Sequence, residues 1–217
     1  MCNQLVIFDC DGVLVDSEVL YIQIDQQVLA TLGWAISRDE VIDRFVGRSH
    51  EHFVEVVEEH LGRKLPNNWE ESFDHLYRES LERELQSVEG IVEALNAIMG
   101  PTCVASNGRH EKIRFSLGLT GLLPRFEGRI FSASDVARSK PAPDLFQFAA
   151  SSLGHKSSDC IVVEDSWAGV TAALAADMKV IAYAGGLTPR EKLEGKGVLI
   201  IDHMSQLPEA LDALTSN

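Results

Sequence analysis

Short apolar runs alternate with helical spacings along most of the 217-residue chain. The first run, Leu5–Phe8, is four apolar residues long, too short for a core helix and typical of a strand that is buried on both faces of a parallel sheet. Five later runs have the same character, namely Thr102–Ala105, Arg129–Phe131, Cys160–Val163, Lys179–Tyr183 and Val198–Ile201. Helical patterns separate these later runs, so we expect an α/β fold with a Rossmann-like parallel sheet.

Residues 16–85 have a different, helical pattern. Apolar residues recur every four positions before Gly33, at Leu20, Ile24, Val28 and Leu32. Further helices are predicted after a capping box formed by Ser37 and Glu40, over Phe53–Leu61, and over Trp69–Leu85. Because the first strand belongs with the later ones, we expect a core domain of residues 1–15 and 86–217, with an all-helical domain of residues 16–85 inserted after the first strand.

Composition limits the class of protein and its partners. Hydrophobic residues make up 45% of the chain, enough for a sizeable core, and no apolar run approaches the ~20 residues of a membrane span. The start of the chain does not resemble a signal peptide, and the four cysteines form no Cys-x-x-Cys pair, so we expect a cytoplasmic protein with reduced thiols. The formal net charge of −14 disfavours nucleic acids and anionic membranes as partners.

Two acidic residues, Asp9 and Asp11, follow the first predicted strand. Open parallel sheets bind ligands in the crevice at the carboxyl ends of their strands, so both side chains are expected there and not in the core. Two uncompensated carboxylates in such a crevice need a cation. The sequence therefore predicts a cation site at this edge of the sheet.

The stretch Asp9–Ser17 resembles the first motif of the haloacid dehalogenase superfamily of phosphohydrolases, which is Asp-x-Asp-Gly followed by small or apolar residues. The preceding apolar run and the glycine at position 12 supply the context that a lone Asp-x-Asp lacks. The resemblance implies the α/β core that the apolar runs predict, and a phosphate-ester chemistry at the strand ends.

Polar residues after two other strands match the second and fourth motifs of this superfamily. Ser106 follows Thr102–Ala105 and precedes Asn107 and Gly108, where a hydroxyl and backbone N–H groups can hold phosphate oxygens; an ordinary helix N-cap is the alternative. The acid pair Glu164-Asp165 follows Cys160–Val163, and its alternative is a favourable interaction with a helix dipole.

The third motif is a lysine in a Lys-Pro-x-Pro setting, which matches Lys140 followed by Pro141 and Pro143. A single lysine is usually a solvated surface group. Here the two prolines restrict the backbone, and the resemblance implies that the ammonium neutralises charge at the reaction centre.

The resemblance implies a Mg²⁺ ion and a covalent mechanism. Asp9, the main-chain carbonyl of Asp11, and Asp165 would coordinate the ion, with Glu164 in a water-mediated or outer position. Asp9 would attack phosphorus, and Asp11 would protonate the leaving group and then accept a proton from water. Ser106 and Lys140 would offset charge on the transferring oxygens.

The helical insertion resembles the cap of the β-phosphoglucomutase branch, which closes over the site and reads the substrate. In that branch the cap carries Gly-x-Ser-Arg, whereas this chain has Gly47-Arg48-Ser49-His50, so His50 stands at the arginine position and Arg48 or Arg44 is a possible substitute. This departure favours phosphate hydrolysis over intramolecular phosphoryl transfer like that of β-phosphoglucomutase.

The expected partner is a small phosphorylated metabolite, because Asn107-Gly108-Arg109 also resembles sugar-phosphate phosphatases of this branch. Arg48, His50, Asn107 and Gly108 are the candidate substrate-binding residues, and 6-phosphogluconate is the first candidate substrate. We expect a monomer, with a homodimer left open.

Other classes fit the sequence less well. Dehalogenases and phosphonoacetaldehyde hydrolases lack an acid at the position of Asp11, which disfavours carbon–halogen and carbon–phosphorus cleavage. A phosphoacceptor signalling module also keeps acids and a lysine at strand ends, but a helical lid serves small-molecule binding and not partner docking. A catalytically inactive binding protein is disfavoured because every motif acid is present, and nicotinamide or ATP dependence because no dinucleotide or Walker-type loop occurs.

Overall fold

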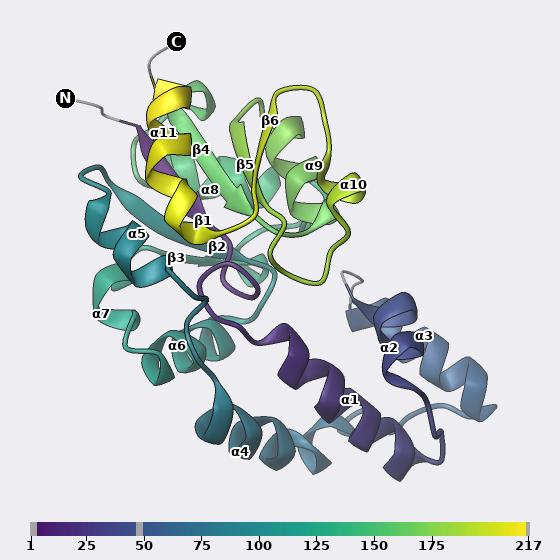
Figure 1. The fold of residues 1–217 in the computed structure, drawn as a ribbon. Coiled ribbons are helices and arrows are strands. Elements are labelled where there is room, and N and C mark those ends of the chain that lie inside the picture. The colour runs from purple at the N-terminus through teal and green to yellow at the C-terminus, as the bar shows by residue number, and fades with distance from the viewer. Residues whose placement is uncertain (1–3, 47–49, 216–217) are drawn as a thin grey trace. The chain divides into compact units, whose positions relative to one another are not determined.

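The computed structural model describes residues 4–46 and 50–215 and divides the chain into two compact units (Figure 1). The core unit comprises Met1–Asp16 and Gln86–Asn217, and the helical unit comprises Ser17–Leu85. The division falls one residue later than the expected start of the insertion, because the Asp16 N–H donates to the Gln86 carbonyl (2.9 Å) and ties Asp16 to the core unit.

Within the described residues, one sheet of parallel strands forms the centre of the core unit. Its strands are β1 (Leu5–Phe8), β2 (Thr102–Ser106), β3 (Ile130–Ser132), β4 (Cys160–Glu164), β5 (Lys179–Tyr183) and β6 (Val198–Ile201). Their order is β3-β2-β1-β4-β5-β6, so β1 lies in the middle, with Ile7 paired to Cys103 on one side and to Val162 on the other. The predicted α/β fold and parallel sheet are confirmed; β3 begins one residue later than its apolar run.

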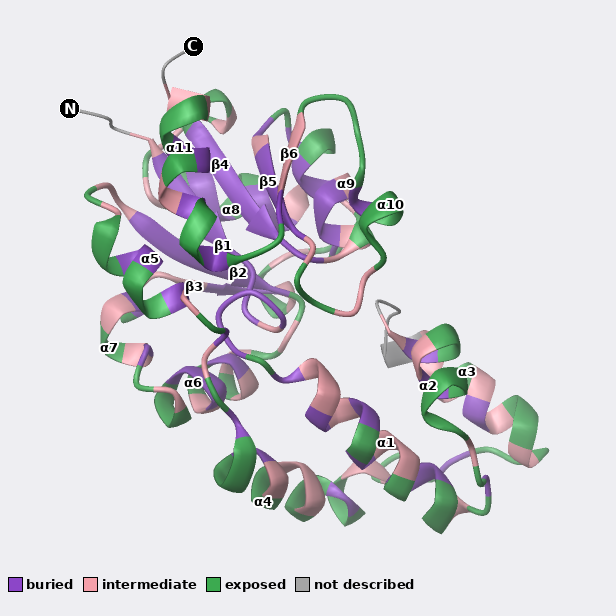
Figure 2. Cartoon of the chain, viewed as in Figure 1, coloured by how far each residue is buried: buried purple, intermediate pink, exposed green. Residues whose placement is uncertain are grey.

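Helices cover both faces of the sheet. They are α5 (Ile91–Ala97), α6 (His110–Leu119), α7 (Leu123–Phe126), α8 (Asp144–Ser152), α9 (Trp167–Ala175), α10 (Arg190–Leu193) and α11 (Leu207–Thr215), with short 3-10 turns η2 (Ala133–Asp135), η3 (Ser157–Asp159) and η4 (Met204–Gln206). Strand residues alternate between faces, so Leu5 and Ile7 pack with α8 and α9, whereas Phe8 contacts Phe126 of α7 on the other face, with ring centroids 6.2 Å apart. Figure 2 shows the central strands β1, β2 and β4 buried, the edge strand β6 mostly of intermediate burial, and the exposed positions on the outer sides of the helices.

The chain leaves β1 through a tight turn that holds the first motif in place. The Cys10 carbonyl accepts hydrogen bonds from the N–H groups of Leu14 (2.9 Å) and Val15 (3.1 Å), and Gly12 donates to the Val15 carbonyl (2.9 Å). Gly12 has φ +76°, a conformation that residues with a Cβ rarely adopt. The turn therefore fixes the backbone on which Asp9 and Asp11 stand.

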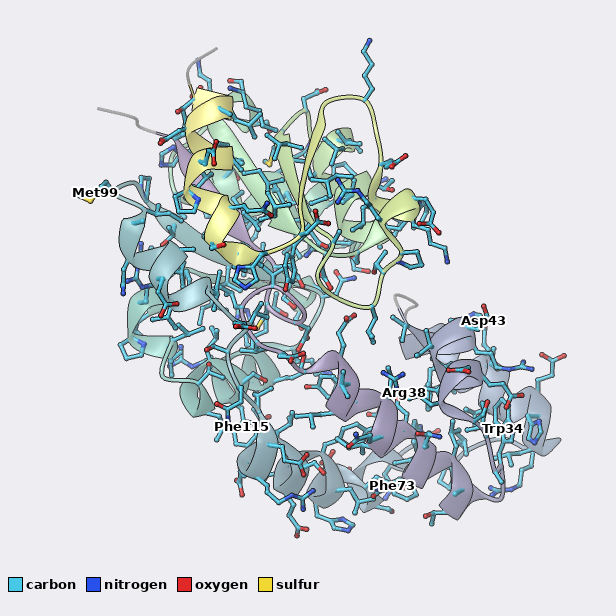
Figure 3. The ribbon with its side chains drawn as sticks, in the orientation of Figure 1. Trp34, Arg38, Asp43, Phe73, Met99 and Phe115 are labelled. Carbon is cyan, nitrogen blue, oxygen red and sulfur yellow. The ribbon has the colours of Figure 1, made fainter. Side chains whose placement is uncertain are left out.

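The helical unit contains α1 (Glu18–Leu32), α2 (Arg38–Phe45), α3 (His50–Leu61), the 3-10 turn η1 (Glu70–Ser72) and α4 (Asp74–Glu84). Phe73, labelled in Figure 3, packs in a small core with Ile24 and Val28 of α1. Tyr77 of α4 donates to Asp25 Oδ1 of α1 (2.6 Å), which adds a polar connection between the two helices.

The helical prediction for this unit is confirmed, with one change of boundary. Gly33 ends α1 in the left-handed conformation, and Ser37 and Glu40 form the predicted capping box of α2. The fourth helix begins at Asp74 and not at Trp69, because the Phe73 N–H bonds to the Glu70 carbonyl (2.8 Å) and closes a 3-10 turn first.

The described cysteines, Cys10, Cys103 and Cys160, are buried and free, as the sequence predicted for its thiols, and Cys2 lies outside the described residues. Among the described helices, none has both the length and the apolar character needed to cross a membrane.

Candidate active site

The motif residues of the core unit come together at the carboxyl ends of β1, β2 and β4. Asp9 directly follows β1, Ser106 ends β2, and Glu164 ends β4 with Asp165 next in the chain. Asp9, Glu164 and Asp165 can each bring one carboxylate oxygen within 4.8 Å of the others. The pattern of polar residues at strand ends thus predicted a real cluster, because parallel strands end at a common edge.

Lys140 lies at the centre of this cluster and is almost completely buried, with 3% of its side chain exposed. Its Nζ lies 2.6 Å from Asp9 Oδ1 and 2.8 Å from Glu164 Oε1, and it stands 4.7 Å from the centre of the Phe146 ring. Burial favours the neutral amine, but the two carboxylates outweigh it and raise the pKa of Lys140 above its ordinary value. Lys140 is therefore a permanently charged group in a buried position, unlike the solvated lysines that are usual at a protein surface.

The environment of Asp9 disfavours ionisation of its carboxyl group. Burial raises the pKa of Asp9 from 3.8 to about 7 although Lys140 acts against the rise, and the Glu164 and Asp11 carboxylates add to it. Asp9, Glu164 and Asp165 gather three carboxyl groups at this point, and the Lys140 ammonium pairs with two of them. Such a set of hard oxygen donors fits a divalent cation such as Mg²⁺.

Both oxygens of Glu164 already have partners. Oε1 accepts from Lys140, while Oε2 accepts from the N–H groups of Asp165 (2.9 Å) and Ser166 (2.8 Å) and from the Ser166 hydroxyl (2.8 Å). Gly169 makes this arrangement possible, because a Cβ at that position would lie 1.8 Å from Oε1. Glu164 is thus fixed beside Lys140, which fits the outer position expected for it better than direct coordination.

Ser106 does not cap the following helix, so the alternative interpretation of this residue is wrong. Helix α6 begins at His110 after Arg109, and Ser106 Oγ instead accepts the N–H of Gly108 (3.1 Å). A hydroxyl that accepts from the backbone keeps its own hydrogen available for an anionic oxygen. Ser106 is 2% exposed and lies at the strand end beside Asp9.

Asn107 makes two hydrogen bonds to the Lys140 backbone that the sequence did not indicate. Its Oδ1 accepts the Lys140 main-chain N–H (3.1 Å) and its Nδ2 donates to the Lys140 carbonyl (3.3 Å). The side chain therefore connects the loop after β2 to the loop that presents Lys140. Substrate binding by Asn107 and Gly108 stays a prediction; the Gly108 N–H, which was expected to face phosphate, points at Ser106.

The sequence did not indicate a second lysine of the site, Lys112. Lys112, in the first turn of α6, places its Nζ 2.9 Å from Asp11 Oδ2. The only sequence clue is its position, because the first turn of a helix that starts at a strand end lies next to that end. Two expected substrate-binding groups, Arg48 and the side chain of His50, lie outside the described residues.

Comparisons with known proteins agree with the motifs. Residues 6–183 match the family model described as haloacid dehalogenase-like hydrolase. The 6-phosphogluconate phosphatase of Escherichia coli is 34% identical over 210 residues, covering 95% of this chain and 93% of the relative, and a probable pseudouridine-5'-phosphatase of Drosophila melanogaster is 32% identical over 196 residues, covering 86% and 84%.

A solved structure leads to the same family. A conserved haloacid dehalogenase-like protein of unknown function from Agrobacterium tumefaciens has a TM-score of 0.83 and 34% identity, covering 97% of this chain and 98% of the other. The family match spans β1, β2 and β4, whose ends position Asp9, Ser106 and the acid pair, and it also spans the loop that carries Lys140. This chain therefore belongs to the haloacid dehalogenase-like hydrolases, and it is an enzyme whose named relatives are phosphatases.

Proposed function

We propose that the protein is a Mg²⁺-dependent phosphatase that hydrolyses a small phosphorylated sugar or sugar acid through an aspartyl-phosphate at Asp9. The observation that carries the proposal is the buried contact of Asp9 Oδ1 with the Lys140 ammonium, next to Asp165, which can share a cation with Asp9. The two relatives named as phosphatases support the same class of reaction.

In the first step Asp9 attacks phosphorus in line, a new P–O bond forms to its carboxylate, and the P–O bond to the sugar oxygen breaks. Lys140 holds one oxygen of Asp9 and so orients the carboxylate. The Ser106 hydroxyl donates to a phosphoryl oxygen, and Asp11 gives its proton to the departing sugar oxygen.

In the second step a water molecule attacks phosphorus, Asp11 accepts its proton, and the P–O bond to Asp9 breaks to release phosphate. A bound Mg²⁺ would neutralise charge on the transferring phosphoryl group, held by Asp9, Asp165 and the Asp11 carbonyl. Glu164 stays with Lys140 and keeps the ammonium in place between two carboxylates.

The substrate proposal is 6-phosphogluconate, supported by the 34% identity to the E. coli enzyme over nearly the whole chain. The helical unit is proposed as the cap that closes over the substrate, with Arg48 and His50 among the residues that read it. The relative named for pseudouridine-5'-phosphate shows why the substrate needs a direct test, since it is almost as similar.

The experiment measures phosphate release by the purified protein with Mg²⁺ from 6-phosphogluconate, hexose phosphates and pseudouridine 5'-phosphate. Wild-type turnover with the highest kcat/KM on 6-phosphogluconate supports the substrate proposal, and a higher value on another compound overturns it. Borohydride quenching during turnover should convert residue 9 to homoserine, which mass spectrometry detects. Full activity of the Asp9→Asn variant would overturn the mechanism, while glucose 6-phosphate formed from bisphosphate-primed β-glucose 1-phosphate would show a mutase instead.

A further inference from the structure

Asp11 has a charged partner outside the four motifs. Lys112 Nζ lies 2.9 Å from Asp11 Oδ2, although the two residues are 101 positions apart in the chain. The side chains are 40% and 25% exposed, respectively, so the pair stands at the rim of the site and not in its buried centre. An ion pair this exposed contributes little to stability, which leaves its position as the feature to explain.

Lys112 reaches Asp11 from a well-anchored backbone. It belongs to α6, the helix that also carries Phe115, labelled in Figure 3. Ile113, the next residue in that helix, is buried, and His110 at its first position bonds both carboxylate oxygens of Asp135 at 2.9 Å. The start of α6 is therefore held on two sides, and the lysine extends from a fixed point.

The aliphatic part of Lys112 also passes close to Gly108, in the loop after β2. Its Cδ lies 3.5 Å from where a Cβ of Gly108 would stand, and Ser106 Oγ is equally close to that point. The side chain thus runs over Gly108 before its ammonium meets Asp11.

The two lysines of the site divide the acids between them. Lys140 pairs with Asp9 and Glu164 in the buried centre, whereas Lys112 pairs with Asp11 at the rim. Lys140 thus contacts Asp9, the nucleophile of the proposed reaction, and Lys112 contacts Asp11, which faces the leaving group in that reaction.

We propose that Lys112 is a positioning residue, which holds the Asp11 carboxyl group where it meets the leaving-group oxygen. The proposal rests on the proposed function, in which the P–O bond to the leaving group breaks while that oxygen takes the proton of Asp11, and Asp11 becomes the carboxylate with which the Lys112 ammonium pairs. Without Lys112 the Asp11 side chain loses this contact, and the reaction loses part of its alignment. The decrease in kcat/KM on removing Lys112 should therefore be larger for leaving groups that need a proton more.

The experiment compares phenyl phosphate with p-nitrophenyl phosphate, which have similar shapes but leaving groups of very different basicity. Phenolate needs a proton more than nitrophenolate does, and kcat/KM reports the step in which either departs. For Lys112→Met we expect kcat/KM on phenyl phosphate to fall about tenfold and on p-nitrophenyl phosphate less than about twofold. Lys112→Arg should recover most of the loss, and the exposed Lys156→Met control should behave like the wild type.

Asp11→Asn should show the same discrimination between the two esters, and adding Lys112→Met to Asp11→Asn should cause no further loss. Equal losses on both esters from Lys112→Met, or no loss, would overturn the positioning role. If Asp11→Asn discriminates and Lys112→Met does not, only the Lys112 proposal fails. If Asp11→Asn itself does not discriminate, the proposed role of Asp11 fails and the Lys112 proposal fails with it. Melting temperatures close to that of the wild type exclude unfolding as the cause.

Discussion

The carboxylate of Asp165 fills the space beside the Cα of Gly12. A Cβ at position 12 would lie 2.1 Å from Asp165 Oδ2 and 2.7 Å from its Cγ. Asp165 is buried, with 3% of the residue exposed, so its carboxylate has little room to move aside. Gly12 therefore has two roles: it adopts a φ of +76°, and its missing side chain leaves room for the Asp165 carboxylate.

Gly12→Ala should displace the Asp165 carboxylate and lower both Mg²⁺ affinity and kcat/KM, the latter by about a hundredfold or more. The strained backbone should also reduce the free energy of unfolding by about 1–3 kcal/mol. The matched control is Gly128→Ala, since Gly128 has φ +75° but no atom within 4 Å of the added Cβ. That control should lose similar stability and keep full activity; equal activity of the two variants would contradict the explanation.

A second glycine gives a sharper test, because its backbone is helical and unstrained. Gly169→Ala in α9 should favour the helix by about 1 kcal/mol, yet the new Cβ would lie 1.8 Å from Glu164 Oε1. We expect the Glu164 carboxylate to leave Lys140 and kcat to fall by about tenfold or more, measured by steady-state phosphate release. Gly118→Ala in α6, where the nearest atom is 4.0 Å away, should keep wild-type kcat. Wild-type kcat in Gly169→Ala would show that the Glu164–Lys140 contact is dispensable.

The local pattern of the sequence predicted the site residues that follow strands, but not the contacts between distant loops. Asp9, Ser106 and Asp165 each follow an apolar run, and runs of this kind become neighbouring strands whose ends meet at one edge. Partners that depend on distant loops were not visible: Asn107 and Lys140 are 33 positions apart, and Asp11 and Lys112 are 101 apart. Periodicity records which face of an element is buried, and it carries no information on which polar groups meet across loops.

The same reasoning explains the misplaced start of the fourth helix. The apolar stripe from Trp69 to Leu85 has helical spacing throughout, but a 3-10 turn and an α-helix can place apolar residues on one face over such a short stretch. The hydrogen bond from Phe73 to Glu70 decides between them, and it is a property of the folded chain.

Asn107 provides a test between substrate binding and positioning. Asn107→Ala removes both hydrogen bonds to the Lys140 backbone, so the loop that carries the ammonium should loosen and kcat should fall by about tenfold or more, with KM little changed. Asn107→Asp keeps the acceptor for the Lys140 N–H but replaces the donor to its carbonyl, and its kcat should lie between those of the wild type and Asn107→Ala. Asn96→Ala, on the outer helix α5, is the control. A large rise in KM with unchanged kcat would instead support the substrate contact that the sequence suggested.

Protons and Mg²⁺ should compete for Asp9. Burial raises its pKa from 3.8 to about 7 in the metal-free protein, so the native state binds a proton that the unfolded chain has already lost. The metal-free protein should therefore lose stability as the pH rises from about 4 to about 7, because the buried acid must ionise without a metal ion and the Lys140 ammonium offsets only part of the cost.

Mg²⁺ binding requires the ionised carboxylate, so its apparent Kd should fall as the pH rises from about 6 to about 8, by at most about tenfold per pH unit below the pKa of Asp9. The measurement is the increase in Tm with Mg²⁺ at each pH, which should grow over this range and disappear after treatment with a chelator. Asp165→Asn should weaken the Mg²⁺ effect at every pH while Asp9 still titrates. A Tm increase that is independent of pH, or unchanged in Asp165→Asn, would show that the cation binds elsewhere.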